Sequence, residues 1–468
     1  MPTLTVIQNK SKKTIEFEGE RLLAELLDIA DAHIDKPCGG RGICRKCAVL
    51  VNGKSELACR YTVVGDACVE LPEGRDILSV TGASETGKAT QNTCLCLDIG
   101  TTTLALALVS LDEKSVIKTK TAPNPQRKFG ADVISRIEYS TKHGVGEMQR
   151  VLLDKLKVMI TELFAEFGIL SVEKMYVAGN TTMLHIFFGV DCSSLGVCPY
   201  TPVFLEEKTV DGASLGLESI NEIITLPGIS AFVGADVVAG LGYVKKPQVG
   251  KYSLLIDLGT NAETVLFGEE KFLCATAAAG PCFEGANISS GMSATVGAVC
   301  AFSGGKYSVI GDVEPEGICA TGLVDIAAEL VKKGIVDDSG YMETDFVISE
   351  EVSLTPADIR ELQLAKSAVR SAVECLILRA GIGYEDIETM YVAGGFSAEL
   401  NFENAAFIGL FPQQLIDRAV CVNNSSLLGA VKYACDGIDL KEITASAEYI
   451  DLGADGAFSN LFFENMAF

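Results

Sequence analysis

Residues 95–103 read Leu95-Cys-Leu-Asp98-Ile-Gly100-Thr101-Thr102-Thr103, and the pattern returns as Leu254-Leu-Ile-Asp257-Leu-Gly259-Thr260-Asn261-Ala262. A second pair of motifs follows in the same order, Met175-Tyr-Val-Ala-Gly179-Asn180 and Met390-Tyr-Val-Ala-Gly394-Gly395. A long helical pattern precedes the second motif in each half, at 147–167 and at 356–380. Chance repetition of two unlike motifs in one order is improbable. The sequence therefore predicts an internal duplication into two α/β lobes with a cleft between them.

Each Asp-x-Gly-Thr motif lies between two apolar runs, which predicts a hairpin turn whose amides and Thr hydroxyls face outward as phosphate donors. Asp98 and Asp257 are then expected to face each other across the cleft and to hold Mg2+ through water molecules, because octahedral Mg2+ takes few carboxylates. The glycine pair at 394–395 allows close approach of a flat adenine or ribose. We predict an ATP site with these nucleotide-binding residues: Gly100, Thr101, Thr102, Thr103, Gly259, Thr260, Asn261, Gly394 and Gly395.

Asp236, in Val-Gly-Ala-Asp-Val, is a third candidate catalytic residue beside Asp98 and Asp257. A carboxylate at the junction of the lobes could orient the attacking water or a water bound to Mg2+. An aspartate near a helix N-terminus also has a purely structural explanation. Glu263, two residues after Asn261, is a candidate of the same rank. The sequence leaves both explanations open.

Four cysteines near the N-terminus have the spacing of an iron–sulfur site. Cys38, Cys44 and Cys47 lie in Cys-Gly-Gly-Arg-Gly-Ile-Cys-Arg-Lys-Cys, close to the plant-type C-x4-C-x2-C spacing but with five residues in the first gap. Asn52-Gly53 between apolar runs predicts a two-residue hairpin turn, which makes position 47 face position 58 and returns Cys59 beside Cys47. A zinc ribbon would need two CxxC knuckles, and this segment has one. We therefore predict a 2Fe–2S cluster on these four thiolates.

The first 72 residues have the outline of an α+β ferredoxin (β-grasp) domain, with strands expected at 3–8, 14–18 and 66–71 and a helix at 20–32. Cys68, on the last of these strands, is interpreted as a bystander. Residues 73–93 show little periodicity and predict a flexible linker with a reach of roughly 25 Å. The expected domains are 1–72 (ferredoxin-like), 73–93 (linker), 94–250 (first lobe) and 251–468 (second lobe).

Composition limits the environment and the partners. The 16 cysteines, scattered through apolar runs, and the lack of a signal peptide at the start favour a reducing, cytoplasmic compartment. No run of 18 uncharged apolar residues occurs, so we expect no membrane span. The formal charge of -24, from 38 basic and 62 acidic residues, disfavours nucleic acid and anionic membranes as partners.

The duplicated motifs resemble those of the actin-like ATPase superfamily, which includes sugar and acetate kinases, heat-shock chaperones and dehydratase activators. Several longer phrases are similar to the reductive activators of corrinoid-dependent methyltransferases. These phrases are Asn124-Pro-Gln, Phe129-Gly-Ala-Asp-Val-Ile-Ser-Arg-Ile137, Gly179-Asn-Thr-Thr-Met-Leu-His185, Leu226-Pro-Gly-Ile-Ser-Ala-Phe-Val-Gly-Ala-Asp236 and Gly280-Pro-Cys-Phe-Glu-Gly-Ala-Asn-Ile288, with shorter ones at 199–203, 359–366 and 423–426.

In that family a 2Fe–2S domain passes one electron to cobalt and returns an inactive Co(II) corrinoid to Co(I), with ATP hydrolysis as the drive. The resemblance implies an ATP-dependent iron–sulfur reductase whose partners are a corrinoid protein of a methyltransferase system and a low-potential electron donor. It leaves the oligomeric state open, a homodimer included. Two rival classes remain: a small-molecule kinase with an appended ferredoxin, and a non-catalytic electron-transfer or docking protein with a nucleotide switch.

Overall fold

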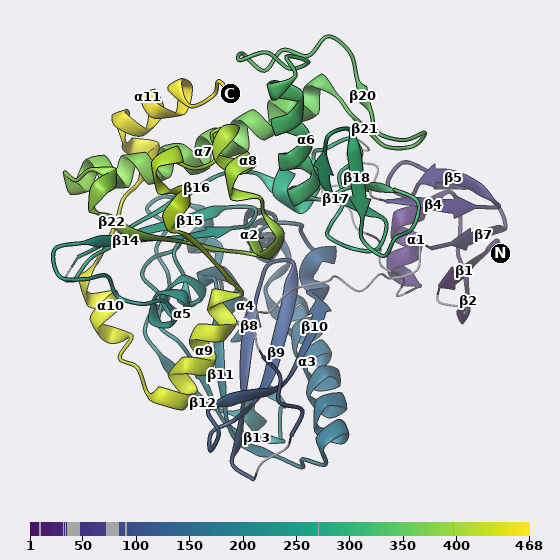
Figure 1. The fold of residues 1–468 in the computed structure, drawn as a ribbon. Helices are drawn as coiled ribbons and strands as arrows, with labels where there is room; N and C mark the ends of the chain where they lie inside the picture. Colours follow the sequence, from purple (N-terminus) through teal and green to yellow (C-terminus); the bar gives the residue numbers. More distant parts are fainter. Residues whose placement is uncertain are drawn as a thin grey trace.

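A computed structural model describes residues 1–8, 11–30, 32, 34, 47–71, 84–88, 91–269, 271–395 and 397–468. The chain forms an N-terminal module and two larger lobes, each built around its own sheet (Figure 1). Within these ranges, no helix combines the length and apolar composition that crossing a bilayer would require.

The N-terminal module is a five-stranded sheet in the order β2-β1-β7-β4-β5, with one helix packed on it. The central strands β1 and β7 are parallel, and their buried residues Leu4 and Val69 share a core with Leu26 of the helix. The helix is shorter than predicted because Arg21 and Leu22 pair with another strand instead. The elements are β1 (Thr3–Gln8), β2 (Ser11–Glu16), β3 (Arg21–Leu22), α1 (Leu23–Ile29), β4 (Ala48–Val51), β5 (Lys54–Leu57), β6 (Thr62–Val63) and β7 (Ala67–Glu70).

The predicted turn at Asn52-Gly53 is confirmed. Both residues have a positive φ, 50° and 78°, as a type I′ hairpin turn requires. Val51 pairs with Lys54, and the amide of Ala58 donates to the carbonyl of Cys47 at 2.9 Å. Position 47 therefore faces position 58, in the register that the sequence predicts.

The first lobe is built on a six-stranded sheet in the order β10-β9-β8-β11-β13-β12. Its central strand β8 is buried along almost its whole length, because helices cover both faces of the sheet. In Figure 1, α3 and α9 lie on opposite sides of these strands. The elements are β8 (Thr93–Ile99), β9 (Thr103–Ser110), β10 (Ser115–Pro123), α2 (Val133–His143), α3 (Gly146–Phe167), β11 (Val172–Gly179), α4 (Thr181–Phe187), β12 (Lys208–Asp211), β13 (Ile220–Thr225) and α5 (Ala235–Tyr243).

The second lobe repeats this plan with the order β23-β22-β14-β15-β16-β24 and adds a small sheet, β18-β17-β19, beside α6. Helix α7 packs on β15 and β16. The elements are β14 (Tyr252–Leu258), β15 (Ala262–Phe267), β16 (Phe272–Ala277), β17 (Ala298–Ser303), β18 (Lys306–Val309), β19 (Gly317–Ile318), α6 (Ala320–Lys332), β20 (Phe346–Val347), β21 (Ser353–Leu354), α7 (Pro356–Ala380), β22 (Ile387–Ala393), α8 (Phe402–Phe407), β23 (Ala419–Asn423), α9 (Ser425–Asp436), α10 (Lys441–Ser446), β24 (Ala447–Tyr449) and α11 (Gly456–Glu464).

The strand registers confirm the duplication. In the first lobe β8 and β9 form the hairpin, and β11 runs parallel to β8 so that Gly179 pairs with Ile99. In the second lobe β14 and β15 form the hairpin, and β22 runs parallel to β14 so that Ala393 pairs with Asp257. Both long helices are present at the predicted places, and Thr355 and Asp358 form a capping box at the start of α7.

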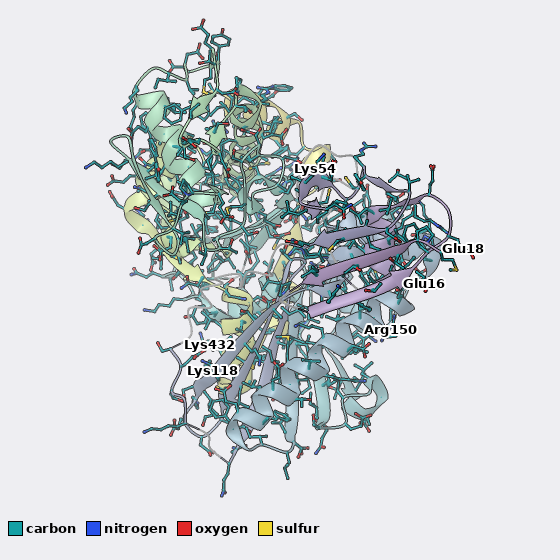
Figure 2. The ribbon with its side chains drawn as sticks, turned by 90° about the vertical axis from the view of Figure 1, so that its right-hand side faces the viewer. Glu16, Glu18, Lys54, Lys118, Arg150 and Lys432 are labelled. Carbon is teal, nitrogen blue, oxygen red and sulfur yellow. The ribbon has the colours of Figure 1, made fainter. Side chains whose placement is uncertain are left out.

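Helices α5 and α9 tie the two lobes together. Helix α5 contacts β11 of the first sheet and β14 of the second, while α9 returns from the second half of the chain to pack on β8 and β11. The two helices approach so closely that a Cβ on Gly429 would lie 1.9 Å from the carbonyl oxygen of Ala239. Any residue other than glycine would therefore clash at position 429. Lys432, labelled in Figure 2, donates to the carbonyl of Tyr243. Packing of α5 and α9 therefore joins the chain before and after the predicted boundary at residue 250.

Residues 84–88 belong to the stretch predicted as a flexible linker, most of which lies outside the described residues. The amides of Thr86 and Gly87 donate to carbonyls of β10 at 3.0 Å. Glu85 forms an ion pair at 2.8 Å with Lys118, which is labelled in Figure 2. This part of the linker is therefore attached to the edge strand of the first lobe, where the sequence predicts free chain.

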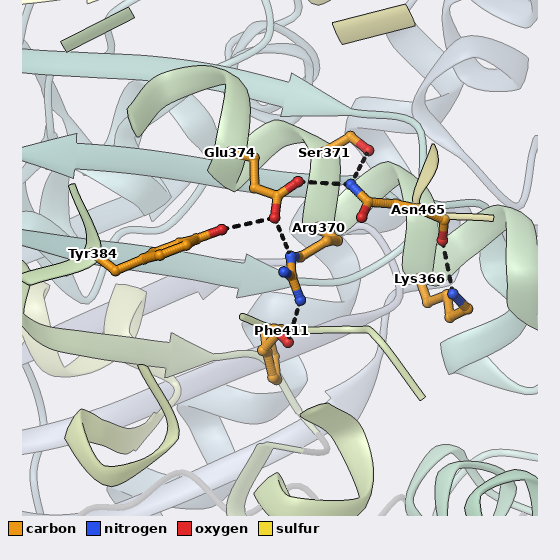
Figure 3. A network of polar contacts seen from close by, with 7 residues as sticks. All are labelled: Lys366, Arg370, Ser371, Glu374, Tyr384, Phe411 and Asn465. Atoms are coloured by element: carbon orange, nitrogen blue, oxygen red, sulfur yellow. Dashed lines mark hydrogen bonds and ion pairs between the residues drawn. The ribbon is translucent and has the colours of Figure 1, made fainter. Parts of the chain in front are cut away.

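The C-terminal residues dock on α7 through polar contacts (Figure 3). Lys366 donates from Nζ to the carbonyls of Asn465 (2.7 Å) and Ala467 (2.5 Å), and burial lowers its pKa to about 8. The Asn465 side chain donates to Glu374 at 2.8 Å, and Arg370 donates to the same carboxylate at 2.6 Å. The charged groups inside this contact are thereby paired or hydrogen-bonded, as buried charges must be.

Candidate nucleotide site at the junction of the lobes

The two predicted hairpin turns both form, but they differ in detail. The amide of Gly100 donates to the carbonyl of Thr103 at 3.0 Å, and that of Gly259 donates to the carbonyl of Asn261 at 2.9 Å. A Cβ on Gly100 would lie 2.6 Å from the Thr103 carbonyl oxygen, whereas one on Gly259 would have its nearest neighbour at 3.5 Å. The close turn therefore requires glycine in the first lobe only.

Three side chains from different elements hold the first turn. Asn124 donates from Nδ2 to the carbonyl of Gly100 at 2.8 Å, and Asn180 donates to Oγ1 of Thr101 at 3.1 Å. Arg136 of α2, which is completely buried, donates from Nη2 to the carbonyl of Thr101 at 2.5 Å. These contacts fix the backbone whose outward amides the sequence predicts as phosphate donors. All three residues lie in the phrases that resemble the activator family, and the sequence alone assigns them no role.

Arg136 places a positive charge behind this turn. Burial lowers its pKa to about 9, and the nearby carboxylates of Asp132 and Glu284 raise it. A group with that pKa remains protonated at neutral pH. The first turn is therefore backed by a buried cation, which favours an anionic ligand in front of it.

The candidate catalytic aspartates come together at the junction. Asp98 is the second-last residue of β8, and Asp257 is the second-last residue of β14. Asp236 lies in the first turn of α5, where its Oδ1 accepts the amide of Val237 at 2.8 Å. Burial, with a smaller contribution from the charge of Asp98, raises the pKa of both Asp236 and Asp257 to about 7. Asp236 therefore lies at a helix start, as its structural explanation requires, and also close to the other two carboxylates, while its catalytic role stays a prediction.

Glu263 joins the same acidic group, because it pairs with Asp257 across the β14–β15 hairpin. Burial and the charges of Asp236 and Asp257 raise its pKa well above the ordinary value. Neighbouring carboxylate charges thus help to raise the pKa values of Asp236, Asp257 and Glu263. A divalent cation in this region would offset unfavourable charge. In the described ranges, no three His, Cys, Asp or Glu side chains are close enough to bind a metal directly.

Asp98 is held by the opposite half of the chain. Asn424 donates from Nδ2 to one carboxylate oxygen of Asp98 at 2.9 Å, and Ser426 donates from Oγ to the other at 2.8 Å. Asn424 is also the N-cap of α9, accepting the amide of Leu427 at 2.8 Å. Only the fold shows that this cap reaches residue 98.

The Gly394-Gly395 pair follows β22 as expected, but the two glycines differ. Gly394 has a φ of 108°, and a Cβ there would lie 2.2 Å from the carbonyl oxygen of Leu258. Contact with the neighbouring strand therefore requires Gly394, without reference to a ligand. Gly395 has open space where its Cβ would be. Of the two glycines, only Gly395 therefore fits the expectation that the pair leaves room for an adenine or ribose.

Glu284 is the residue that sequence reasoning missed most clearly. One of its carboxylate oxygens accepts a hydrogen bond from Oγ1 of Thr102 at 3.1 Å, and the other accepts one from Oγ1 of Thr260 at 2.8 Å. A single carboxylate thus connects the two turns. Its position inside Gly280-Pro-Cys-Phe-Glu-Gly gives no local signal of this, because both partners are distant in sequence.

The predicted cluster ligands are described only in part, since Cys38 and Cys44 lie outside the described residues. Cys47 and Cys59 lie at the two ends of the β4–β5 hairpin, and both are buried. Cys68 lies on β7, where its amide donates to Asn52 Oδ1 at 2.8 Å. The hairpin brings together the two described ligand candidates, as the spacing predicts.

The raised pKa values of Asp236 and Asp257 predict that the folded protein becomes less stable as the pH rises. Asp236 and Asp257 have ordinary pKa values near 3.8 and folded-state values of about 7. Between pH 3.8 and about 7 the folded protein binds more protons than the unfolded protein does. Stability that is present at low pH is therefore lost as the pH rises through about 7. Asp257→Asn should make the unfolding free energy less pH-dependent by about 1.4 kcal/mol between pH 6 and 8, measured by urea unfolding without metal. Identical pH profiles for both proteins would contradict the prediction.

Comparisons with known proteins agree with this architecture. The C-terminal domain of RACo, the ASKHA domain, matches residues 251–468, and the RACo middle region matches residues 93–245. The chain is 28% identical over 416 residues to "Corrinoid activation enzyme RamQ" of Eubacterium limosum, covering 80% of this chain and 70% of that protein. It is 26% identical over 424 residues to "[Co(II) methylated amine-specific corrinoid protein] reductase" of Methanosarcina barkeri, covering 79% and 75%.

A solved structure described as "Reductive activator for corrinoid,iron-sulfur protein" matches with a TM-score of 0.72 and 26% identity, over 99% of this chain and 98% of that one. Two duplicated lobes, with their hairpin turns facing one junction, define a protein of the actin-like ATPase fold. The two RACo matches, which together span almost all of residues 93–468, place it further: the chain belongs to the RACo family of reductive activators of corrinoid proteins.

Proposed function

We propose that this protein couples ATP hydrolysis at the junction of its lobes to the one-electron reduction of a partner's corrinoid, from inactive Co(II) to Co(I), through a 2Fe–2S cluster in the N-terminal module. The observation that carries the proposal is the paired turns with their partly buried aspartates, in a chain whose relatives are named corrinoid activation enzyme and Co(II) corrinoid protein reductase.

In this proposal the turns at 100–103 and 259–261 bind the ATP phosphates, with Arg136 supplying positive charge behind the first turn. Asp98 and Asp257 hold Mg2+ through water, in keeping with a site that offers acidic oxygens without direct three-ligand geometry. Asp236 is the candidate for orienting the attacking water. Its pKa of about 7 suits proton exchange at neutral pH.

The N-terminal module has a donor set that suits a cluster. Thiolates hold 2Fe–2S centres. Cys47 and Cys59 lie at neighbouring positions at the open end of the β4–β5 hairpin, because position 47 pairs with position 58. Cys38 and Cys44 would complete the set. When bound, the cluster supplies a one-electron carrier. The reducing cytoplasm expected from the cysteine content fits such a carrier.

Iron content tests this ligand set. Reconstituted under anaerobic conditions, the protein should carry about two irons per chain, the content of a 2Fe–2S centre. Cys59→Ala should lose most of this iron because it removes one of four ligands. Cys68→Ala is the matched control, since Cys68 lies on β7 away from the hairpin ends, and it should keep its iron. An equal loss in both variants, measured by iron assay and visible spectrum, would refute the assignment.

ATP is needed because the electron transfer is uphill. A plant-type 2Fe–2S centre has a potential near about -400 mV, Co(I) formation requires a lower one, and each 59 mV costs about tenfold in the equilibrium of a one-electron transfer. Nucleotide-dependent movement of the lobes about α5 and α9 could favour the Co(I) state of a bound partner. A ligand shifts such an equilibrium only by its differential affinity for the two states.

Two other functions make different predictions. A small-molecule kinase would transfer phosphate to a hydroxyl acceptor, so ATP use without a phosphorylated small molecule would exclude it. A docking protein with a passive nucleotide switch would bind ATP without turnover. Measuring ATP hydrolysis with and without an oxidised corrinoid protein distinguishes both from the proposed reductase. The electron donor is expected to be a low-potential protein, and gel filtration would test for a homodimer.

A further inference from the structure

Glu284 occupies the donors that a nucleotide phosphate would need. Its two carboxylate oxygens accept hydrogen bonds from Thr102 of the first lobe and Thr260 of the second, at 3.1 and 2.8 Å. Each of these hydroxyls has a single proton to donate. A phosphate oxygen can therefore receive a hydrogen bond from either threonine only if the carboxylate gives it up.

The second lobe holds Glu284 in place. Glu284 ends the short 3-10 helix Pro281–Glu284, in which Cys282 and Phe283 are buried in the second-lobe core. The next two amides close the turn, since Gly285 donates to the carbonyl of Cys282 at 3.0 Å and Ala286 donates to that of Pro281 at 3.1 Å. The bond to Thr260 therefore stays within one lobe, while the bond to Thr102 crosses to the other.

Charge adds to the competition for hydrogen bonds. A carboxylate and a phosphate at the same two hydroxyls would place like charges within hydrogen-bond distance of one another, which is unfavourable in a partly buried site. Arg136 behind the first turn is the nearby cation, and it is near enough for the Glu284 charge to raise its pKa. The positive charge of Arg136 can stabilise either the Glu284 carboxylate or a nucleotide phosphate, but the two anions cannot both bind the hydroxyls at the turn.

We propose that Glu284 is a phosphate-competing clasp, which joins the two lobes through Thr102 and Thr260 in the nucleotide-free protein and is displaced by the nucleotide phosphates. This inference rests on the proposed ATP site. The clasp reduces nucleotide affinity and makes separation of Glu284 from Thr102 part of nucleotide entry. It thereby links phosphate binding directly to the contact between the lobes.

The test compares Mg2+–ADP affinity in the reconstituted full-length protein by calorimetry. Glu284→Gln keeps the size of the side chain and removes its charge, so it should bind Mg2+–ADP about tenfold more tightly than the wild type, and Glu284→Ala should do the same. Without nucleotide, Glu284→Ala should melt at a lower temperature because it loses the contact between the lobes. Tighter binding together with lower stability is a combination that a purely structural residue does not produce.

Two further variants separate the explanations. Thr102→Val breaks the same contact from the other side but also removes a phosphate donor, so it should bind Mg2+–ADP more weakly than the wild type. Glu361→Gln is the matched control, because Glu361 contacts Asn287 at 3.3 Å near the same turn and touches neither threonine; it should bind like the wild type. If Glu284→Gln binds Mg2+–ADP as the wild type does or more weakly, the clasp is overturned. This holds also if the variant binds like the wild type but has lost ATP hydrolysis. Failure of the wild type to bind Mg2+–ADP would instead overturn the ATP site.

Discussion

Replacing Asp257 by alanine should reduce Mg2+-dependent ATP hydrolysis by roughly 100-fold or more, the scale expected when a central electrostatic group of an active site is removed. Asp98→Ala should have a similar effect. Both carboxylates lie next to the end of a strand at the lobe junction and raise the local negative charge that a metal ion would offset. The visible spectrum of the cluster should stay intact, because the N-terminal module has its own hydrophobic core.

The measurement is phosphate release under saturating ATP, with the absorbance spectrum recorded on the same samples. Asp112→Asn is a suitable control, since Asp112 follows the C-terminal end of β9, away from the turn at 100–103. Its side chain is exposed, and among the contacts described it pairs only with Asn92. It should hydrolyse ATP at the wild-type rate. Hydrolysis near the wild-type rate by either alanine variant would show that the paired aspartates are not the metal site.

The second large effect concerns the coupling of the two activities. With a low-potential reductant and an oxidised corrinoid protein, the intact protein should form Co(I) at least about 100-fold faster with ATP than without it. A transfer that is about 118 mV uphill has an equilibrium constant of about 0.01, so its forward rate constant is only about one hundredth of its reverse rate constant. Anaerobic visible absorbance follows the loss of Co(II) and the gain of Co(I) directly.

Two variants divide this coupled activity. Cys59→Ala should hydrolyse ATP and form no Co(I), because the electron has no carrier. Asp257→Ala should accept electrons into its cluster and form Co(I) only at the rate of the wild type without ATP. If the wild type forms Co(I) equally fast with and without nucleotide, ATP is not the drive. The protein would then be a ferredoxin-like carrier fused to a nucleotide-binding domain that does no work.

The sequence alone predicted the features that depend on neighbouring residues. Asn52-Gly53 determined the register of the β4–β5 hairpin, because a two-residue turn with positive φ has one pairing pattern. The Asp-x-Gly-Thr motifs predicted both central hairpins, and the helical pattern at 356–380 predicted α7 with its observed bounds. Repetition of such local signals in one order was enough to indicate two lobes of the same plan.

Only the tertiary structure decided what crosses between the lobes. Glu284 joins Thr102 to Thr260, and Asn424 and Ser426 hold Asp98, across separations of up to 328 residues. Helix α9 likewise packs on the first lobe although it belongs to the second half of the chain. No periodicity or spacing encodes these contacts, because hydrogen bonds and close packing act over a few ångströms in space. Which distant residues come within that range is settled only when the two sheets and the α5–α9 pair have packed together.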